Sequence, residues 1–169
     1  MKFFNTKNLV LTAIIAALYT TLTIAFAPIC YGPVQFRVSE ALTILPIFGL
    51  PSVLGLTLGC AISNIYGVSI GQTMALDILI GTLATLIAAV LTYNIGKTRN
   101  KKIKYFIGPL PAVIVNAVVV GIELTFFYKG SLFLNMLYVG VGELLVCYTL
   151  GLALIFIIDK NKLNKKIFN

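Results

Sequence analysis

Long apolar stretches, separated by short polar, glycine- or proline-containing breaks, dominate the pattern of hydrophobic and polar positions along the chain. About 20 apolar residues cross the hydrocarbon core of a bilayer as an α-helix. The pattern predicts six helices, over residues 8–27, 38–48, 51–67, 73–96, 107–128 and 132–158. We therefore expect an all-α, polytopic membrane protein, a six-transmembrane-helix bundle that forms a single membrane domain over residues 1–169.

The second of these predicted helices, 38–48, is unusually short. Pro46, Gly49 and Pro51 interrupt the apolar run at this place and predict two helices joined by a tight turn. A helix of this length does not span a bilayer alone. We therefore expect neighbouring helices to shield it from lipid.

The basic residues are unevenly distributed and predict the orientation. The chain has 13 Lys and Arg against five Asp and Glu, and all the basic residues except Arg37 and Lys129 fall in clusters at 2–7, 97–104 and 160–166. The positive-inside rule places the three clusters in the cytoplasm. An even number of crossings must then separate them, which predicts six crossings with both termini inside the cell.

The first apolar run also resembles a secretory signal peptide. Lys2 and Lys7 precede it, and the Ala-Phe-Ala sequence at 25–27 imitates a cleavage site. The run is nevertheless as long as a full membrane span, and its removal would leave an odd number of crossings. We expect an uncleaved first helix.

Composition and motif spacing argue against an enzyme. The chain has no His, so Ser-His and Cys-His pairs are excluded, and Ser69 in the G-x-S-x-G sequence at 67–71 has no base to activate it. The Gly-Lys-Thr sequence at 96–98 resembles the end of a P-loop, but Leu91 stands where the first glycine belongs. An aspartyl intramembrane protease needs two facing aspartates in the membrane, but Asp77 is the only aspartate there and Asp159 lies at the cytoplasmic boundary. We expect no catalytic residues, no metal site and no cofactor.

Four of the five acids lie within or at the edge of predicted helices, namely Glu40, Asp77, Glu123 and Glu143. An ionisable group at the centre of a membrane helix costs roughly 2.5–3.5 kcal/mol, so each needs a partner, a water-filled cavity or a ligand. In the predicted orientation the first three lie near the outer side, and Glu143 lies about 15 Å into the last helix. Asn116 precedes Glu123 by two helical turns on the same face. The pattern predicts a bowl of acids that opens outward, with Glu143 at its floor.

Some of these residues also have a purely structural interpretation. Glu40 can favour its helix N-terminus and pair with Arg37 three residues earlier. Asp77 precedes small residues at 81, 84 and 88, so it can join helices, and Asn116 can do the same. Glu123 and Glu143 are harder to explain by a purely structural role. The residues alone leave these alternatives open.

Small residues at helical spacing mark two surfaces. Ala13 and Ala17 form an A-xxx-A pair on the first helix, and Gly55 and Gly59 form a G-xxx-G pair on the third. Both patterns allow helices to approach closely. We expect the glycine pair to pack within the bundle, whereas the alanine pair can face another protein.

The segment Tyr-Gly-Pro-Val-Gln-Phe-Arg-Val-Ser-Glu-Ala-Leu-Thr at 31–43 resembles the QueT family, the predicted queuosine-precursor substrate-binding subunits (S components) of energy-coupling factor (ECF) transporters. The similarity extends over nearly the whole chain, including residues 59–64 and the segments around Glu123 and Glu143. Its most specific part contains Arg37 and Glu40, which makes both of them candidates for the ligand site.

The resemblance implies a module that captures a vitamin-like ligand from outside the cell membrane. Such a module works with a transmembrane coupling subunit and two ATPase subunits, and the partners alone use ATP. In relatives, an Ala-xxx-Ala pair on the first helix contacts the coupling subunit, and Ala13 and Ala17 match it. The loop after the first helix acts as a lid in relatives, which implies a gating role for residues 31–37.

The implied ligand, a 7-deazaguanine base, can be matched to candidate side chains. It presents N–H donors along one edge, a carbonyl beside them and, in some precursors, a cationic aminomethyl arm. Glu143 can accept two hydrogen bonds from the edge, and Asn116 or Gln35 can donate to the carbonyl. Glu123 or Asp77 can neutralise the arm. Tyrosines near the predicted outer mouth can stack on the ring: Tyr31, Tyr66 and Tyr138.

Three other functions fit parts of the same pattern. A stand-alone or ion-coupled carrier would also contain intramembrane acids, although the chain is small and shows no inverted repeat of broken helices. A scaffold subunit would explain the small-residue pairs but not the acids. An S component for a different vitamin would keep the mechanism and change the substrate.

Overall fold

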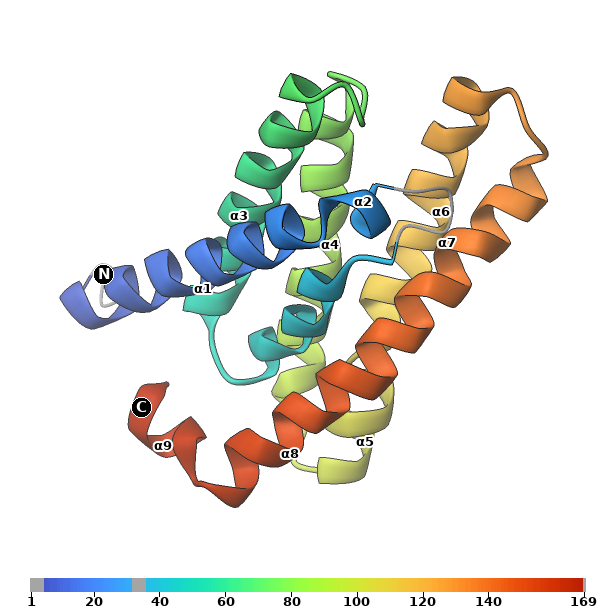
Figure 1. Cartoon of the computed structure of the whole chain (residues 1–169). Helices are drawn as coiled ribbons and strands as arrows, with labels where there is room; N and C mark the ends of the chain where they lie inside the picture. Colours follow the sequence, from blue (N-terminus) through green and yellow to red (C-terminus); the bar gives the residue numbers. More distant parts are fainter. Residues whose placement is uncertain (1–4, 32–35, 169) are drawn as a thin grey trace.

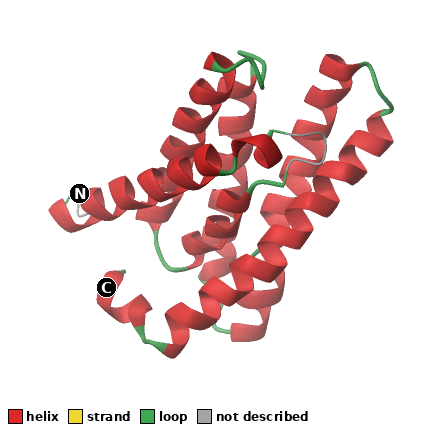
Figure 2. Ribbon diagram, in the orientation of Figure 1, coloured by secondary structure: helices red, strands yellow, loops and turns green. Residues whose placement is uncertain are grey.

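The protein is built from helices joined by short loops (Figures 1 and 2), and a computed structural model describes residues 5–31 and 36–168. In chain order the elements are α1 (Thr6–Ala25), α2 (Ala27–Cys30), the 3₁₀-helix η1 (Val38–Ile47), α3 (Leu50–Ser69), α4 (Asp77–Gly96), α5 (Lys101–Ile107), α6 (Leu110–Tyr128), α7 (Leu132–Val146), the π-helix η2 (Cys147–Gly151), α8 (Leu152–Lys160) and α9 (Leu163–Ile167). The predicted all-α class is confirmed.

Within the described residues, five helical segments are long and apolar enough to cross a membrane: Thr6–Ala25, Leu50–Ser69, Asp77–Gly96, Lys101–Phe127 and Leu132–Lys160. The chain is therefore a multi-pass membrane protein. The predicted helix over 38–48 corresponds to η1, an apolar helix of 10 residues that is shorter than these spans. The count of six crossings and the orientation of the termini stay predictions.

The helix η1 runs through the interior of the molecule (Figure 1). Every residue from Ser39 to Ile47 is buried, and η1 packs against α1, α3, α4, α7, η2 and α8. The expected shielding of this short segment is thus confirmed. Long 3₁₀-helices are uncommon because their hydrogen bonds are poorly aligned, so surrounding helices must hold this one in place.

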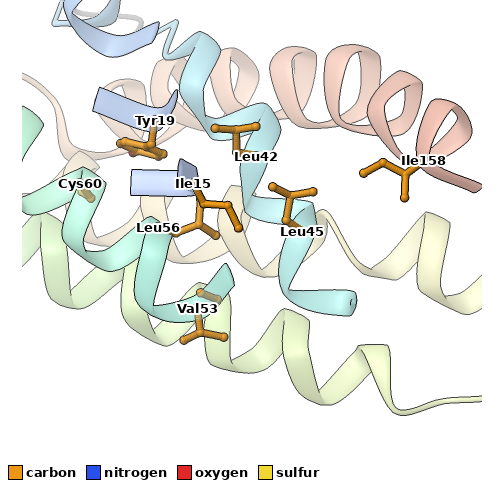
Figure 3. Close-up of a cluster of buried hydrophobic side chains, with 9 residues drawn as sticks. Ile15, Tyr19, Leu42, Leu45, Val53, Leu56, Cys60 and Ile158 are labelled. Carbon is orange, nitrogen blue, oxygen red and sulfur yellow. The ribbon is translucent and has the colours of Figure 1, made fainter. Parts of the chain in front are cut away.

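The glycines Gly55 and Gly59 bring α3 against α1. A Cβ atom at Gly55 would lie 2.8 Å from the Cβ of Ile15, and one at Gly59 would lie 2.8 Å from the Cβ of Tyr19. Ile15, Tyr19 and Leu56 belong to the apolar cluster between these helices (Figure 3). The predicted packing of the glycine pair within the bundle is confirmed.

Several helix boundaries differ from the predicted ones. The predicted helix 73–96 begins only at Asp77, and 107–128 begins at Leu110. The basic segment between the predicted helices 73–96 and 107–128 forms α5, and Asn100 Oδ1 caps this helix by accepting a 3.0 Å hydrogen bond from the Lys102 N–H. The last predicted helix, 132–158, is interrupted by the π-turn of η2.

The end of the chain folds back onto the turn that follows η1. The ring of Phe168 stacks on that of Phe48, with ring centroids 5.4 Å apart. Leu163 of α9 packs against the cluster that also contains Ile158. These contacts cover the end of the bundle where the turn between η1 and α3 lies.

Candidate ligand-binding site

The predicted functional residues converge on η1 and its neighbours. Arg37, Glu40, Asp77, Asn116 and Glu143 are each at most 5% exposed. They come from the start of η1, the first residue of α4, the middle of α6 and the second half of α7. The structure therefore gathers charged and amide side chains from four separate segments in the interior of the bundle.

Two hydrogen-bond donors lie near the carboxylate of Glu143: a neutral amide and a weakly donating thiol. Asn116 Nδ2 donates a 3.1 Å hydrogen bond to Glu143 Oε1, and the Cys147 thiol lies 3.7 Å from Glu143 Oε2. A carboxylate has about four lone-pair positions, so it can accept further hydrogen bonds from a ligand. Cys147 also begins the π-turn of η2, and such turns occur frequently at functional sites.

Glu40 lies beside Glu143 in the same interior region. Its Oε1 accepts a hydrogen bond from the phenol of Tyr19, whereas its Oε2 has no donor among the described residues. The Cys147 thiol lies 3.6 Å from the backbone oxygen of Glu40 and 3.7 Å from Glu143 Oε2, so it connects the two acids. Two acids that share one buried region with few donors favour a ligand that supplies N–H groups.

Arg37 pairs with Asp77, with Nη2 3.4 Å from Oδ2, and its guanidinium lies 5.5 Å from the centre of the Tyr31 ring. This differs from the i, i+3 pair with Glu40 that the sequence suggested. The reason is that Arg37 is the N-cap of η1 with an extended backbone, so it does not share a helical face with Glu40. The Nε of Arg37 has no acceptor among the described residues.

Asp77 is held at the start of α4 by its neighbours. Asn64 Nδ2 donates a 2.9 Å hydrogen bond to the backbone oxygen of Asp77. A Cβ atom at Gly81 would collide with Asp77 Oδ1, so the glycine leaves room for the carboxylate. Since Asp77 Oδ1 has no donor among the described residues, the pair with Arg37 uses only half of this acid.

Asp77 also faces Glu123 across a small pocket. The pocket is lined by Tyr31, Gln72, Thr73, Met74, Asp77, Val120, Glu123, Leu124 and Phe127. Both carboxylate oxygens of Glu123 are buried without a donor among the described residues. The free volume of the pocket is about 20 Å³, which is room for about one water molecule. A bicyclic base would therefore require this region to open.

The other predicted site residues lie in different settings. Tyr31 is buried and its hydroxyl donates a 2.6 Å hydrogen bond to the Ser63 backbone oxygen, while the half-buried Tyr66 packs against the Tyr31 cluster. Tyr138 is 45% exposed and does not line the pocket between Asp77 and Glu123. Gln35 lies outside the described residues. Whether these side chains contact a ligand stays a prediction.

Three residues of this region were not singled out from the sequence: Tyr19, Asn64 and Cys147. Tyr19 and Asn64 are both fully buried at 0% exposure, and each lies well inside a membrane helix. Interfacial tyrosines lie near the ends of membrane helices. A polar side chain away from those ends was therefore the available sequence signal for a buried contact. Cys147 stands one helical turn after Glu143, on the same face, and its position could have been read from that spacing.

Ionisable residues within membrane-spanning helices are typical of proteins that transport polar solutes, and the buried, incompletely paired acids fit that class. The chain belongs to the QueT transporter family, whose sequence profile matches residues 9–160. Its class is thus that of transporters and not of enzymes.

A curated relative covers part of the chain. The queuosine precursor transporter QueT of Lactococcus lactis subsp. cremoris (strain MG1363) is 39% identical over 89 residues, which is 52% of this chain and 50% of that protein. The match therefore spans about half the length of the relative. No solved structure gives a significant match.

Proposed function

We propose that the protein is the substrate-capturing S component of an ECF-type, ATP-driven importer in the cell membrane, and that it binds a queuosine precursor of the 7-deazaguanine class. The observation that carries this proposal is the pair of buried acids Glu40 and Glu143: Glu40 Oε2 has no donor among the described residues, and Glu143 has only the Asn116 amide and the Cys147 thiol as donors. The named function of the Lactococcus lactis relative supports the substrate class.

The chemistry of the base suits this site. The N–H groups along the guanine-like edge can donate to Glu143 and to the free oxygen of Glu40, and the Asn116 amide can donate to the carbonyl beside them. Buried acceptors left without partners penalise analogues that lack these donors. The site thereby selects for the hydrogen-bonding edge of the base.

The partners and the orientation form a second part of the proposal. Both termini lie in the cytoplasm, η1 provides the sixth element of the S-component bundle, and the ligand enters from outside. Ala13 and Ala17 are exposed on α1, next to the exposed Ile14 and Leu18. This face supports close contact with a transmembrane coupling subunit, which joins the protein to two ATPase subunits.

Uptake of a radiolabelled 7-deazaguanine precursor into proteoliposomes tests the proposal. We expect uptake only when the coupling subunit, both ATPases and ATP are present. Uptake that needs an ion gradient and no ATP would instead identify an ion-coupled carrier. Absence of uptake under both conditions would contradict a transport role for this substrate class.

Ala17→Leu provides a matched test of the partner surface. We expect this variant to bind ligand as the unaltered protein does and to lose co-purification with the coupling subunit. Ala153→Leu makes the same change at an exposed alanine of α8, outside the proposed contact face, so it serves as the control and should retain both properties. Equal complex formation by both variants would contradict the proposed contact.

A further inference from the structure

We propose that Asp77 and Glu123 form a subsite for a primary ammonium group, so that the protein prefers 7-deazaguanines with a cationic aminomethyl arm over those with a neutral substituent at the same position. The inference rests on the proposed function, because it assigns one part of the ligand to one part of the binding region. It adds a basis for discrimination among precursors that share the same base.

The first support is the set of unpartnered atoms that line the pocket. Both oxygens of Glu123, Oδ1 of Asp77 and Oγ1 of Thr73 are buried and have no hydrogen-bond partner among the described residues. Asp77 is 4% exposed, so its free oxygen has no access to bulk water. An ammonium group has three donors and no acceptor, which complements a pocket that offers mainly acceptors.

The second support is the local charge. The nine residues that line the pocket include two acids and no Lys or Arg. Arg37 contacts Asp77 from the side of η1 and can balance one negative charge. With both carboxylates ionised, one negative charge remains, and a ligand with a single positive charge neutralises it.

The third support is the apolar setting of Glu123. A groove with a free volume of about 350 Å³ adjoins Glu123 and is lined otherwise by apolar side chains of α4, α6 and the turn before α4, namely Met74, Leu76, Ile80, Val119, Ile122 and Phe126. An unpaired carboxylate in such surroundings is unfavourable, so a cation gains strongly by pairing with it. The rings of Tyr31 and Phe127 in the pocket wall also favour a cation.

The group around Glu143 and the pocket at Glu123 would bind different parts of the ligand. Asn116 and Glu123 lie seven residues apart on α6, which places them about 10 Å apart along its axis. Asn116 belongs to the group around Glu143, where the edge of the base is proposed to bind. Glu123 then meets a substituent that extends from the base toward the pocket.

The test is a calorimetric titration of the purified full chain in lipid nanodiscs with 7-aminomethyl-7-deazaguanine and with 7-cyano-7-deazaguanine. We expect the unaltered protein to bind the amine more tightly than the nitrile. Glu123→Gln should weaken binding of the amine by about 10- to 100-fold, the range of a charge-assisted hydrogen bond, and leave binding of the nitrile unchanged. Glu123→Asp, which retains the charge, should retain the preference.

Asp159→Asn is the matched control. It removes one carboxylate at the end of α8, where Asp159 contacts Lys101 and Tyr105, away from the pocket. We expect it to bind both compounds as the unaltered protein does. Thermal melting of each variant checks that it remains folded.

Each outcome decides a different claim. Equal affinity of the unaltered protein for amine and nitrile, or a Glu123→Gln variant that weakens both or neither, would overturn the ammonium subsite and leave the proposed function standing. If the unaltered protein binds neither base, the proposed function and the subsite are both wrong.

Discussion

Arg37 and Asp77, 40 residues apart in the sequence, form a buried ion pair that joins the start of η1 to the start of α4. Each of these side chains is 5% exposed. A buried charge that loses its partner is strongly unfavourable, whereas the removal of both charges is much better tolerated. The pair therefore fixes the position of the polar group around η1.

We expect Arg37→Gln to destabilise the protein by about 3 kcal/mol, because it leaves Asp77 buried without its counter-charge. The double variant Arg37→Gln with Asp77→Asn should be more stable than Arg37→Gln alone. Thermal unfolding in detergent, followed by circular dichroism, measures both effects. Losses that simply add in the double variant would contradict a direct pair.

Tyr19 supplies the hydrogen bond that Glu40 Oε1 accepts. Tyr19→Phe keeps the ring in its packed position and removes only the hydroxyl. We expect a loss of about 1–3 kcal/mol in stability, since a buried carboxylate oxygen is left without its donor. A Glu40→Gln background should reduce this loss, and a thermal-melting cycle of the two single variants and the double variant measures the coupling. An unchanged loss in that background would argue against the interaction.

Close packing of α1 on α3 makes Gly59 sensitive to substitution. An added Cβ would lie 2.9 Å from the Ala16 backbone oxygen, which cannot move aside as a flexible side chain can. Gly59→Ala should therefore destabilise the protein by about 1–3 kcal/mol. At Gly130 the nearest atom to an added Cβ is 3.5 Å away, so Gly130→Ala is the control and should have little effect on the melting temperature.

The contact between Phe168 and Phe48 connects the end of the chain to the turn after η1. Phe168→Ala should remove about 0.5–1.5 kcal/mol of aromatic pairing. We expect faster proteolysis near the end of the chain, with the rest of the bundle unchanged. Phe168→Leu restores apolar bulk without the ring, so its rate of proteolysis should lie between those of the unaltered protein and Phe168→Ala. Cleavage at the same rate in all three proteins would contradict a stabilising role of the stack.

Much of the helical architecture could be predicted because bilayer-spanning segments need long apolar runs, and the breaks at Pro46, Gly49 and Pro51 mark real ends. The hydrogen-bonding type of η1 could not be predicted, since a 3₁₀-helix of this length depends on the helices packed around it. The helix α5 was missed because helices were predicted from apolar runs and this segment is strongly basic, although Asn100 is a good helix cap.

For the candidate site, the residues could be named but their partners could not. Buried acids are recognisable because charged groups are rare within membrane helices. The pairing of Arg37 with Asp77 required the fold, because neighbours in sequence suggested Glu40 instead. Tyr19 was not singled out because tyrosines are common at membrane interfaces and only those near the predicted outer mouth were considered; within α1 it is a donor to Glu40.

The central claim is that Glu143 binds the donor edge of a 7-deazaguanine. Its most direct measurement is a calorimetric titration of the purified protein and of Glu143→Gln with a 7-deazaguanine precursor. We expect the unaltered protein to bind the base, and Glu143→Gln to lose retention of it while still assembling with the coupling and ATPase subunits. Normal binding by an assembled Glu143→Gln variant would contradict the account.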